Sequence, residues 1–193
     1  MTILIFGVNH EKKNIGSAIT KRFKQLYGNE CIGVSKGMCE PDMRSNNKSP
    51  ISLLVNCIGV FGEDRTLHSL IRNNALKLVD LMYGYKDNFA KDALVLNITS
   101  SAGVRPNPEY PKYSLSKQVA ELVTKQLANE YISRGVYINS IALGRTRTKM
   151  REQVVGKDYL TEVALEPSEV AEFIYGLYHT NQKIYGTTYE LRK

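Results

Sequence analysis

Short apolar runs recur along the chain, and each is bounded by polar or turn-forming residues. Runs of this length that are rich in Val, Ile and Leu are typical of buried strands. One stretch near the end of the chain instead alternates apolar and polar side chains, as a half-exposed strand does. The predicted strands are residues 2–6, 30–34, 51–57, 94–98, 136–141 and 184–191.

Helical periodicity fills most of the spaces between these strands. Apolar residues recur every three or four positions in residues 15–27, 67–82 and 113–132. A further helix begins at Glu166-Pro-Ser-Glu-Val, and we expect Ser168 to be its N-cap. Strands that alternate with helices predict an α/β fold with a doubly wound parallel sheet of Rossmann type. In such sheets ligands bind outside the carboxyl ends of the strands.

One part of the alternation is shortened. Residues 39–50 are polar and show no helical period. We expect a short third strand near Asp42, and a missing or reduced helix before the fourth strand at residues 51–57. The sequence has no repeat, linker or low-complexity segment, which predicts a single domain over residues 1–193.

The composition is that of an ordinary globular domain, because 42% of the 193 residues are hydrophobic and 23% are charged. No apolar run approaches the ~20 residues that a membrane-spanning helix needs. Met1 leads directly into the first predicted strand without a secretory signal. We therefore expect a cytoplasmic protein with no membrane partner. The cysteines and histidines are scattered, which predicts neither a disulfide framework nor a metal site.

The net charge of +7 is compatible with a negatively charged partner such as nucleic acid or a phosphorylated small molecule. The basic residues are spread out, with no basic stripe interleaved with aromatic residues, so we expect no nucleic-acid partner. Residues 149–165 should border the substrate pocket. Arg147 and Arg151 would there meet an acidic or phosphorylated substrate, or would remain solvated surface charges.

The richest chemistry lies between the strand at 94–98 and the helix that follows. Ser100 stands at the strand end, and Tyr113 and Lys117 are spaced so that they share one face of a helix. A free tyrosine has a pKa of about 10 and is a poor acid–base group at neutral pH. A nearby ammonium would lower that pKa. Tyr113 would then exchange a proton with a substrate oxygen that Ser100 polarises.

Five short motifs follow one another along the chain. They are Asn56-Cys-Ile-Gly59, Ser100-x-x-Gly103, Tyr113-x-x-x-Lys117, the passage at residues 127–144 and Thr148-Lys-Met150. Together they resemble the short-chain dehydrogenase/reductase family, and the resemblance covers nearly the whole chain, best over residues 51–150. A second pair with the same spacing, Tyr189 and Lys193, has no serine element in front of it.

The resemblance implies an oxidoreductase that moves a hydride between nicotinamide and a carbonyl or secondary alcohol. It makes Tyr113 the proton donor or acceptor, and Lys117 the residue that lowers its pKa and holds the nicotinamide ribose. Ser100 would orient the substrate oxygen. The family also carries an asparagine that locks a helix kink and holds a water for proton relay; Asn74 fits best, and Asn73 is the alternative.

The start of the chain is where the resemblance places the phosphates of the cofactor. A strand, a glycine-containing turn and a helix present backbone N–H groups and the helix dipole to an anion. The turn departs from the family's TGxxxGIG pattern, because its loop is longer and Asn14 replaces a glycine. Asparagine can adopt left-handed backbone angles there. The expected cofactor-binding residues are Gly7, Asn9, Asn14, Ile15, Gly16, Asn56, Gly59, Tyr113, Lys117, Thr146 and Thr148.

The end of the second strand decides which cofactor is held. Enzymes that prefer NAD place an acidic residue there for the ribose hydroxyl. Here the residues are Ser35 and Lys36, whose hydroxyl and cation suit a 2′-phosphate, so NADP(H) is favoured over NAD(H). The alternative is that Lys36 is a solvated surface lysine.

A rival hypothesis is a non-catalytic NADPH-binding sensor or regulatory protein with the same fold. It rests on the altered first turn, the shortened segment and Leu143, which stands where the family has proline. The intact serine, tyrosine and lysine set speaks against it. The resemblance also implies a homodimer that pairs through the helices beginning near Leu67 and Ser114.

Overall fold

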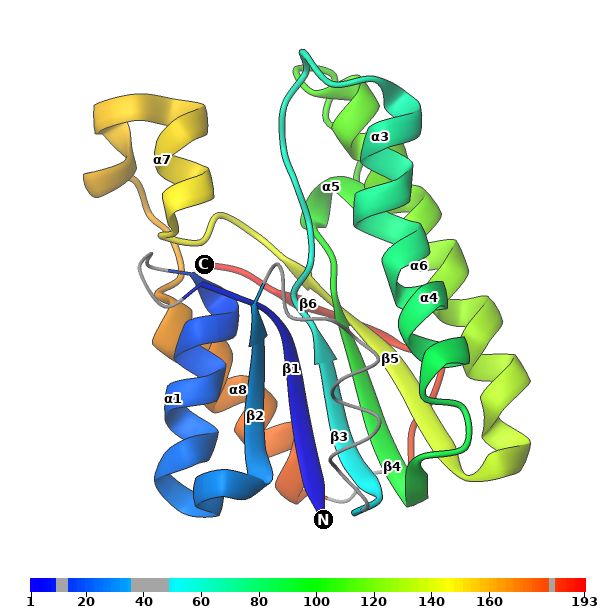
Figure 1. The fold of residues 1–193 in the computed structure, drawn as a ribbon. Coiled ribbons are helices and arrows are strands. Elements are labelled where there is room, and N and C mark those ends of the chain that lie inside the picture. The colour runs from blue at the N-terminus through cyan, green and yellow to red at the C-terminus, as the bar shows by residue number, and fades with distance from the viewer. Residues whose placement is uncertain (10–13, 36–48, 181–182) are drawn as a thin grey trace.

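The computed structural model describes residues 1–9, 14–35, 49–180 and 183–193. These residues form six parallel strands in the order β2-β1-β3-β4-β5-β6 (Figure 1). The predicted doubly wound α/β fold is therefore confirmed. The strands are β1 Thr2–Val8, β2 Cys31–Ser35, β3 Ile51–Asn56, β4 Phe89–Ile98, β5 Val136–Leu143 and β6 Thr188–Leu191.

Helices cover both faces of this sheet (Figure 1). One face carries α1 Ile15–Tyr27 and α8 Pro167–His179, and the other carries α3 Leu67–Ile71, α4 Lys77–Gly84 and α6 Pro111–Tyr131. The short helices α5 Ser101–Val104 and α7 Lys149–Val155 stand beyond the carboxyl ends of the strands. The remaining turns are the 3₁₀ segments η1 Gly28–Glu30, η3 Ile132–Arg134 and η4 Gly156–Leu160, and the π-helical segment η2 Arg72–Leu76.

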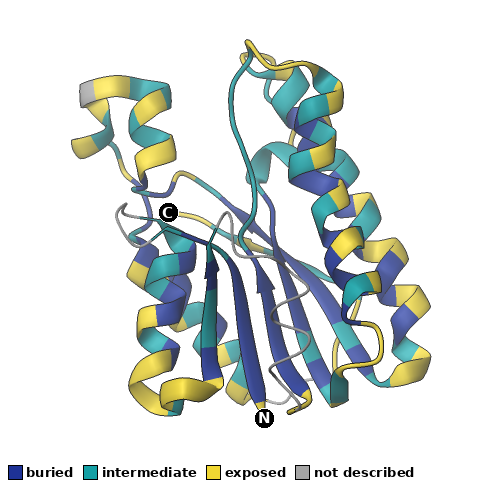
Figure 2. Cartoon of the chain, viewed as in Figure 1, coloured by how far each residue is buried: buried dark blue, intermediate teal, exposed yellow. Residues whose placement is uncertain are grey.

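Alternate residues of each central strand feed two separate hydrophobic cores. In β1, Ile3 and Ile5 join the core with α1 and α8, whereas Leu4 and Phe6 join the core with α4 and α6. The central strands therefore bury both of their faces, which is why they read in the sequence as continuous apolar runs. Figure 2 shows these buried strands between helices that expose their outer faces.

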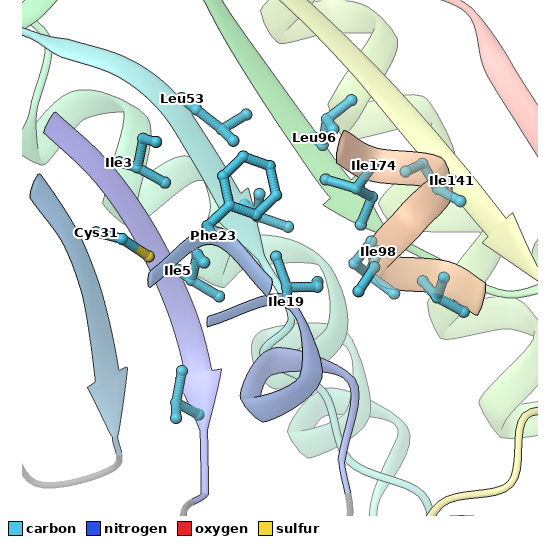
Figure 3. Close-up of a cluster of buried hydrophobic side chains, with 14 of the residues drawn as sticks. Ile3, Ile5, Ile19, Phe23, Cys31, Leu53, Leu96, Ile98, Ile141 and Ile174 are labelled. Atoms are coloured by element: carbon cyan, nitrogen blue, oxygen red, sulfur yellow. The ribbon is translucent and has the colours of Figure 1, made fainter. Parts of the chain in front are cut away.

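The core beneath α1 and α8 is built around Phe23 (Figure 3). Phe23 is fully buried, and its ring centroid lies 5.8 Å from that of Tyr175 and 5.9 Å from that of Tyr178 on α8. Ile19 of α1 and Ile174 of α8 are buried in the same cluster. This packing holds α1 against the sheet, with its N-terminus at the carboxyl edge.

The cap of α8 differs from the prediction. Glu166, not Ser168, is the N-cap, and its side chain and that of Glu169 form a reciprocal capping box. The Glu166 N–H donates to the Glu169 carboxylate at 2.7 Å. Pro167 occupies the first helical position, which suits proline because that residue needs no N–H partner and its φ is fixed at a helical value. The cap therefore falls one residue before the proline.

Every predicted strand differs from the structure at one end or both, and β4 begins at Phe89 instead of residue 94. The last strand was predicted over residues 184–191 but is limited to β6, because Gly186 has a φ of 68° and breaks the extended backbone. Glu30 belongs to η1, so β2 begins one residue later than predicted. The short strand near Asp42 and the reduced helix before the predicted fourth strand, which is β3, concern residues 36–48. These residues lie outside the described part of the chain.

Candidate active site

A cleft of about 450 Å³ opens at the carboxyl edge of the sheet, where ligands bind in this class of fold. The strand order reverses between β1 and β3, beside this cleft. The predicted site residues that line it are Ile15, Gly59, Ser100, Tyr113, Lys117, Thr146 and Thr148. The predicted residues Gly7, Asn9, Asn14, Gly16, Ser35, Asn56 and Asn74 are not among its lining residues, and Lys36 lies outside the described residues.

The serine, tyrosine and lysine come together in the cleft. Ser100 caps α5, where its hydroxyl accepts the Ala102 N–H at 3.2 Å, and it lines the cleft together with Tyr113, whose pKa it lowers. Tyr113 stands in the first turn of α6, which begins with Pro111. The Lys117 Nζ atom lies 5.8 Å from the centroid of the Tyr113 ring. A hydroxyl pair and an ammonium are thus held at one point of the cleft.

The electrostatics of this set differ from the prediction. Burial raises the pKa of Tyr113, and Ser100 only partly opposes this effect. The expected lowering of the Tyr113 pKa is therefore wrong, because exclusion of water from the hydroxyl disfavours the phenolate. Lys117 is buried as well, which lowers its pKa to about 8, although Glu121 and Cys57 act in the opposite direction.

Asn74 lies in the π-helical segment η2 and links two parts of the site. Its side chain accepts the Val60 N–H at 2.7 Å and donates to the Val60 carbonyl at 3.0 Å, which holds the loop after β3. It also donates to the Ser116 hydroxyl of α6 at 2.9 Å. Asn73 instead donates to the Ser69 carbonyl of its own helix at 2.8 Å. Of the two alternatives, Asn74 is the one that contacts the site. It lies in a π-helical turn, which is a feature often found at functional sites.

The first turn has the features of an anion cradle. Gly7 has a φ of 79°, and a Cβ on Gly16 would lie 2.9 Å from the Gly7 carbonyl oxygen, so backbone fills the space where a side chain would be. Asn14 has a φ of −141° and caps α1, where its side chain accepts the Ser17 N–H at 2.7 Å. The expectation of a left-handed Asn14 is therefore wrong. The Ser17 hydroxyl donates to the Asn9 carbonyl at 2.6 Å, which closes the turn.

Asn56, Thr146 and Thr148 mainly fix the conformation of the backbone around the cleft. The buried Asn56 donates to the Asn97 side chain at 2.9 Å, which joins the ends of β3 and β4. Thr146 donates to the Gly144 carbonyl at 3.1 Å, and Thr148 is the N-cap of α7. Side chains crowd Gly59, because a Cβ there would lie 3.3 Å from the Asn74 Oδ1 atom and 3.4 Å from the Lys117 Nζ atom. The residues present therefore fit a nucleotide that contacts backbone at close range.

Arg147 and Arg151 are neither solvated nor presented freely to a substrate. The Arg147 guanidinium donates to the carbonyls of Tyr159 and Leu160 at 2.6 and 2.8 Å and also pairs with Glu166. Arg151 lines the cleft, but Glu162 accepts from its Nε and Nη2 atoms at 2.8 and 2.7 Å. Both side chains thus fasten the segment after α7 and are not freely solvated charges, and a contact of Arg151 with an acidic substrate stays a prediction.

Sequence reasoning missed two groups at this site. Phe61 lies between Tyr110 and Tyr113, with ring centroids 5.0 Å from each, and forms an aromatic wall of the cleft. Glu121 is buried one helical turn after Lys117. The same four-residue spacing that selected Tyr113 and Lys117 also reaches Glu121, so this signal was present in the sequence. The aromatic wall depends on a loop, for which the sequence has no such period.

Comparison with known proteins supports this architecture. The family profile of the short chain dehydrogenases matches residues 43–158. A 3-oxoacyl-acyl-carrier-protein reductase from Synechocystis is 38% identical over 85 residues, which cover 42% of this chain and 34% of that protein. The chain belongs to the short-chain dehydrogenase/reductase family.

Solved structures show the same fold at low sequence identity. A 3-alpha-hydroxysteroid dehydrogenase from Pseudomonas in complex with NADH has a TM-score of 0.82 at 17% identity and covers 99% of this chain and 95% of its own. A short chain dehydrogenase from Burkholderia cenocepacia in complex with NADP has a TM-score of 0.80 at 17% identity, and the match covers 98% of this chain and 95% of its own. In the described ranges, no helix is long and apolar enough to cross a membrane, and no cluster of potential ligands could hold a metal ion.

Proposed function

We propose that the protein is an oxidoreductase that transfers a hydride between NADP(H) and a carbonyl compound or secondary alcohol by a Ser-Tyr-Lys mechanism. The observation that carries this proposal is that Ser100, Tyr113 and Lys117 line one cleft, where the Lys117 Nζ atom lies 5.8 Å from the centroid of the Tyr113 ring. A nicotinamide cofactor is supported by the Pseudomonas and Burkholderia proteins of the same fold, which hold NADH and NADP. A single functional domain and a cytoplasmic location stay predictions.

The bound nicotinamide would supply or accept the hydride, and the residues of this chain would handle the proton. Ser100 and Tyr113 would both donate hydrogen bonds to the substrate oxygen. Burial raises the pKa of Tyr113, so its hydroxyl carries a proton at neutral pH. Transfer of that proton to the substrate oxygen would need the phenolate to be stabilised in the site. The Lys117 ammonium would stabilise the phenolate that remains, and Asn74 would support the return of the proton.

The test is turnover by the purified protein with NADPH and a panel of ketones and aldehydes. The absorbance of the reduced nicotinamide measures the rate. The panel should include neutral apolar carbonyl compounds, because Phe61 and Tyr110 give the cleft an aromatic wall. Consumption of NADPH that depends on the carbonyl compound would support the proposal. Tight NADPH binding without turnover of any panel member would instead favour the sensor hypothesis, which the altered first turn supports. Absence of any nicotinamide binding would overturn both.

We predict that NADPH binds at least about tenfold more tightly than NADH, because a charge-assisted contact of Lys36 with the 2′-phosphate is worth about 1.5–3 kcal/mol. Lys36→Asp should narrow or reverse this preference in a fluorescence titration. Lys21→Asp makes the same change of charge on the exposed side of α1 and should leave the preference unchanged. Equal affinities of the wild type for both cofactors would count against the assignment.

We also propose that the protein forms a homodimer through the outer face of η2, α4 and α6. Leu76 and Tyr83 are exposed on this face, and Leu122 of α6 is 67% exposed. Apolar side chains this exposed on neighbouring helices favour burial against a second copy. Leu122→Arg should convert the dimer to a monomer in sedimentation experiments at micromolar concentration. Leu26→Arg on α1, a residue that is 53% exposed, should not. A monomeric wild type would refute the proposal.

A further inference from the structure

A buried carboxylate lies one helical turn after the lysine of the site, in the same helix. It belongs to Glu121, which is 7% exposed and follows Lys117 in α6. Its oxygens accept hydrogen bonds from three hydroxyls: Thr99, Ser140 at 2.5 Å and Thr188 at 2.8 Å. Thr99 follows β4, and the other two belong to β5 and β6, so three neighbouring strand segments converge on this one side chain.

A carboxylate in the interior is costly unless its charge is compensated. Hydroxyls supply hydrogen bonds but no charge. The buried Lys117 supplies the opposite charge, and the attraction is mutual, because Glu121 favours the ammonium form of Lys117. Thr99 also adjoins Ser100 in the chain, so the carboxylate holds the strand end that carries the serine.

The other titratable groups that face Lys117 do not replace this charge. Cys57, at the end of β3, also favours the ammonium, but burial raises the pKa of its thiol to about 12, so it is neutral at ordinary pH. Tyr113, on the same helix, has a raised pKa and is also neutral. Asn74, from η2, carries no charge. Its Oδ1 atom and the Lys117 Nζ atom both border Gly59, at 3.3 and 3.4 Å from the position of a Cβ there. Glu121 is therefore the group among these that can act as the counter-charge.

We propose that Glu121 is a positioning residue that keeps Lys117 charged at neutral pH and ties that charge to three strand segments of the sheet. Its importance for catalysis rests on the proposed function, in which the Lys117 ammonium stabilises the phenolate of Tyr113. The charge relation itself does not depend on turnover and can be measured in the protein without substrate.

The test is the titration of Lys117 by NMR in protein with ¹³C-labelled lysine, with the resonance assigned by its loss in Lys117→Met. Removal of a negative neighbour lowers the pKa of a lysine, so Glu121→Gln should move the Lys117 midpoint down by about one pH unit or more. Thr188→Val removes one hydrogen bond to the carboxylate but leaves its charge, and should move the midpoint much less. Equal midpoints in Glu121→Gln and the wild type would overturn the proposal.

A measurement on the wild type covers the case in which Glu121→Gln does not fold. A Lys117 midpoint below about pH 7 in the wild type would overturn the proposal without any variant. With an active substrate, the fall of kcat at high pH should also begin at lower pH in Glu121→Gln, whereas a purely structural role would lower kcat at all pH values. The titration uses no substrate, so a failure of the proposed oxidoreductase function would leave its result intact.

Discussion

Tyr113→Phe is expected to lower kcat by about 10²- to 10⁴-fold with a carbonyl substrate that the wild type reduces. The reason is that only the proton-donating hydroxyl is lost. The ring, which packs at 5.0 Å from Phe61, is kept. NADPH affinity should change little, because the backbone of the first turn and the Lys117 side chain are unaltered. Steady-state kinetics and an NADPH titration on the same preparation measure the two effects separately.

The matched control is Tyr189→Phe. Tyr189 and Lys193 form the second tyrosine–lysine pair of this chain with a four-residue spacing. Tyr189 lies in β6 and packs on Phe173 of α8, with ring centroids 6.1 Å apart. Lys193 forms an ion pair with Glu169 at 2.9 Å. This tyrosine therefore lacks the serine and the lysine of the site, and its variant should turn over substrate at nearly the wild-type rate. If Tyr113→Phe also keeps most of that rate, the mechanism is wrong and the sensor hypothesis gains support.

The fold could be predicted because burial on two faces leaves a strong pattern in the sequence. Leu4 and Ile5 enter opposite cores, so β1 shows no polar position in its middle. The parallel α/β sheet and the family followed from such runs and from motifs in a fixed order. The helix cap could not be read in the same way. By residue type Ser168 is the preferred cap, but the position of Pro167 places the cap at Glu166.

The sequence predicted which residues come together in the candidate site, but it did not predict their pKa values. The spacing of Tyr113 and Lys117 gives their shared helix face, but a pKa depends on how much water is excluded from both groups. Burial raises the pKa of Tyr113 and lowers that of Lys117, and neither degree of burial is visible in a short motif. The roles of Arg147 and Arg151 were missed for a similar reason, because carbonyls and carboxylates far along the chain accept their hydrogen bonds.

Gly7→Ala is expected to destabilise the protein by about 2–5 kcal/mol and to weaken NADPH binding. Two costs add. A left-handed backbone costs a residue with a side chain about 1–2 kcal/mol, and Gly7 has a φ of 79°. The new Cβ would also lie 2.7 Å from the backbone carbon and oxygen of Cys57 and 2.9 Å from the Ile58 nitrogen. Overpacking of this kind costs about 1–3 kcal/mol.

The control is Gly135→Ala, which meets only the first of these costs. Gly135 has a φ of 72°, and the nearest atom to a new Cβ would lie at an ordinary 3.6 Å. We expect about 1–2 kcal/mol of destabilisation and unchanged NADPH affinity, because this glycine follows η3, outside the cleft. Urea denaturation of both variants measures the difference. The clash at Gly7 displaces the end of β3, beside the turn that would hold the cofactor phosphates, so stability and NADPH affinity should fall together there. Equal losses of stability in the two variants would show that backbone angle alone, and not the close approach of β1 to the end of β3, requires glycine at position 7.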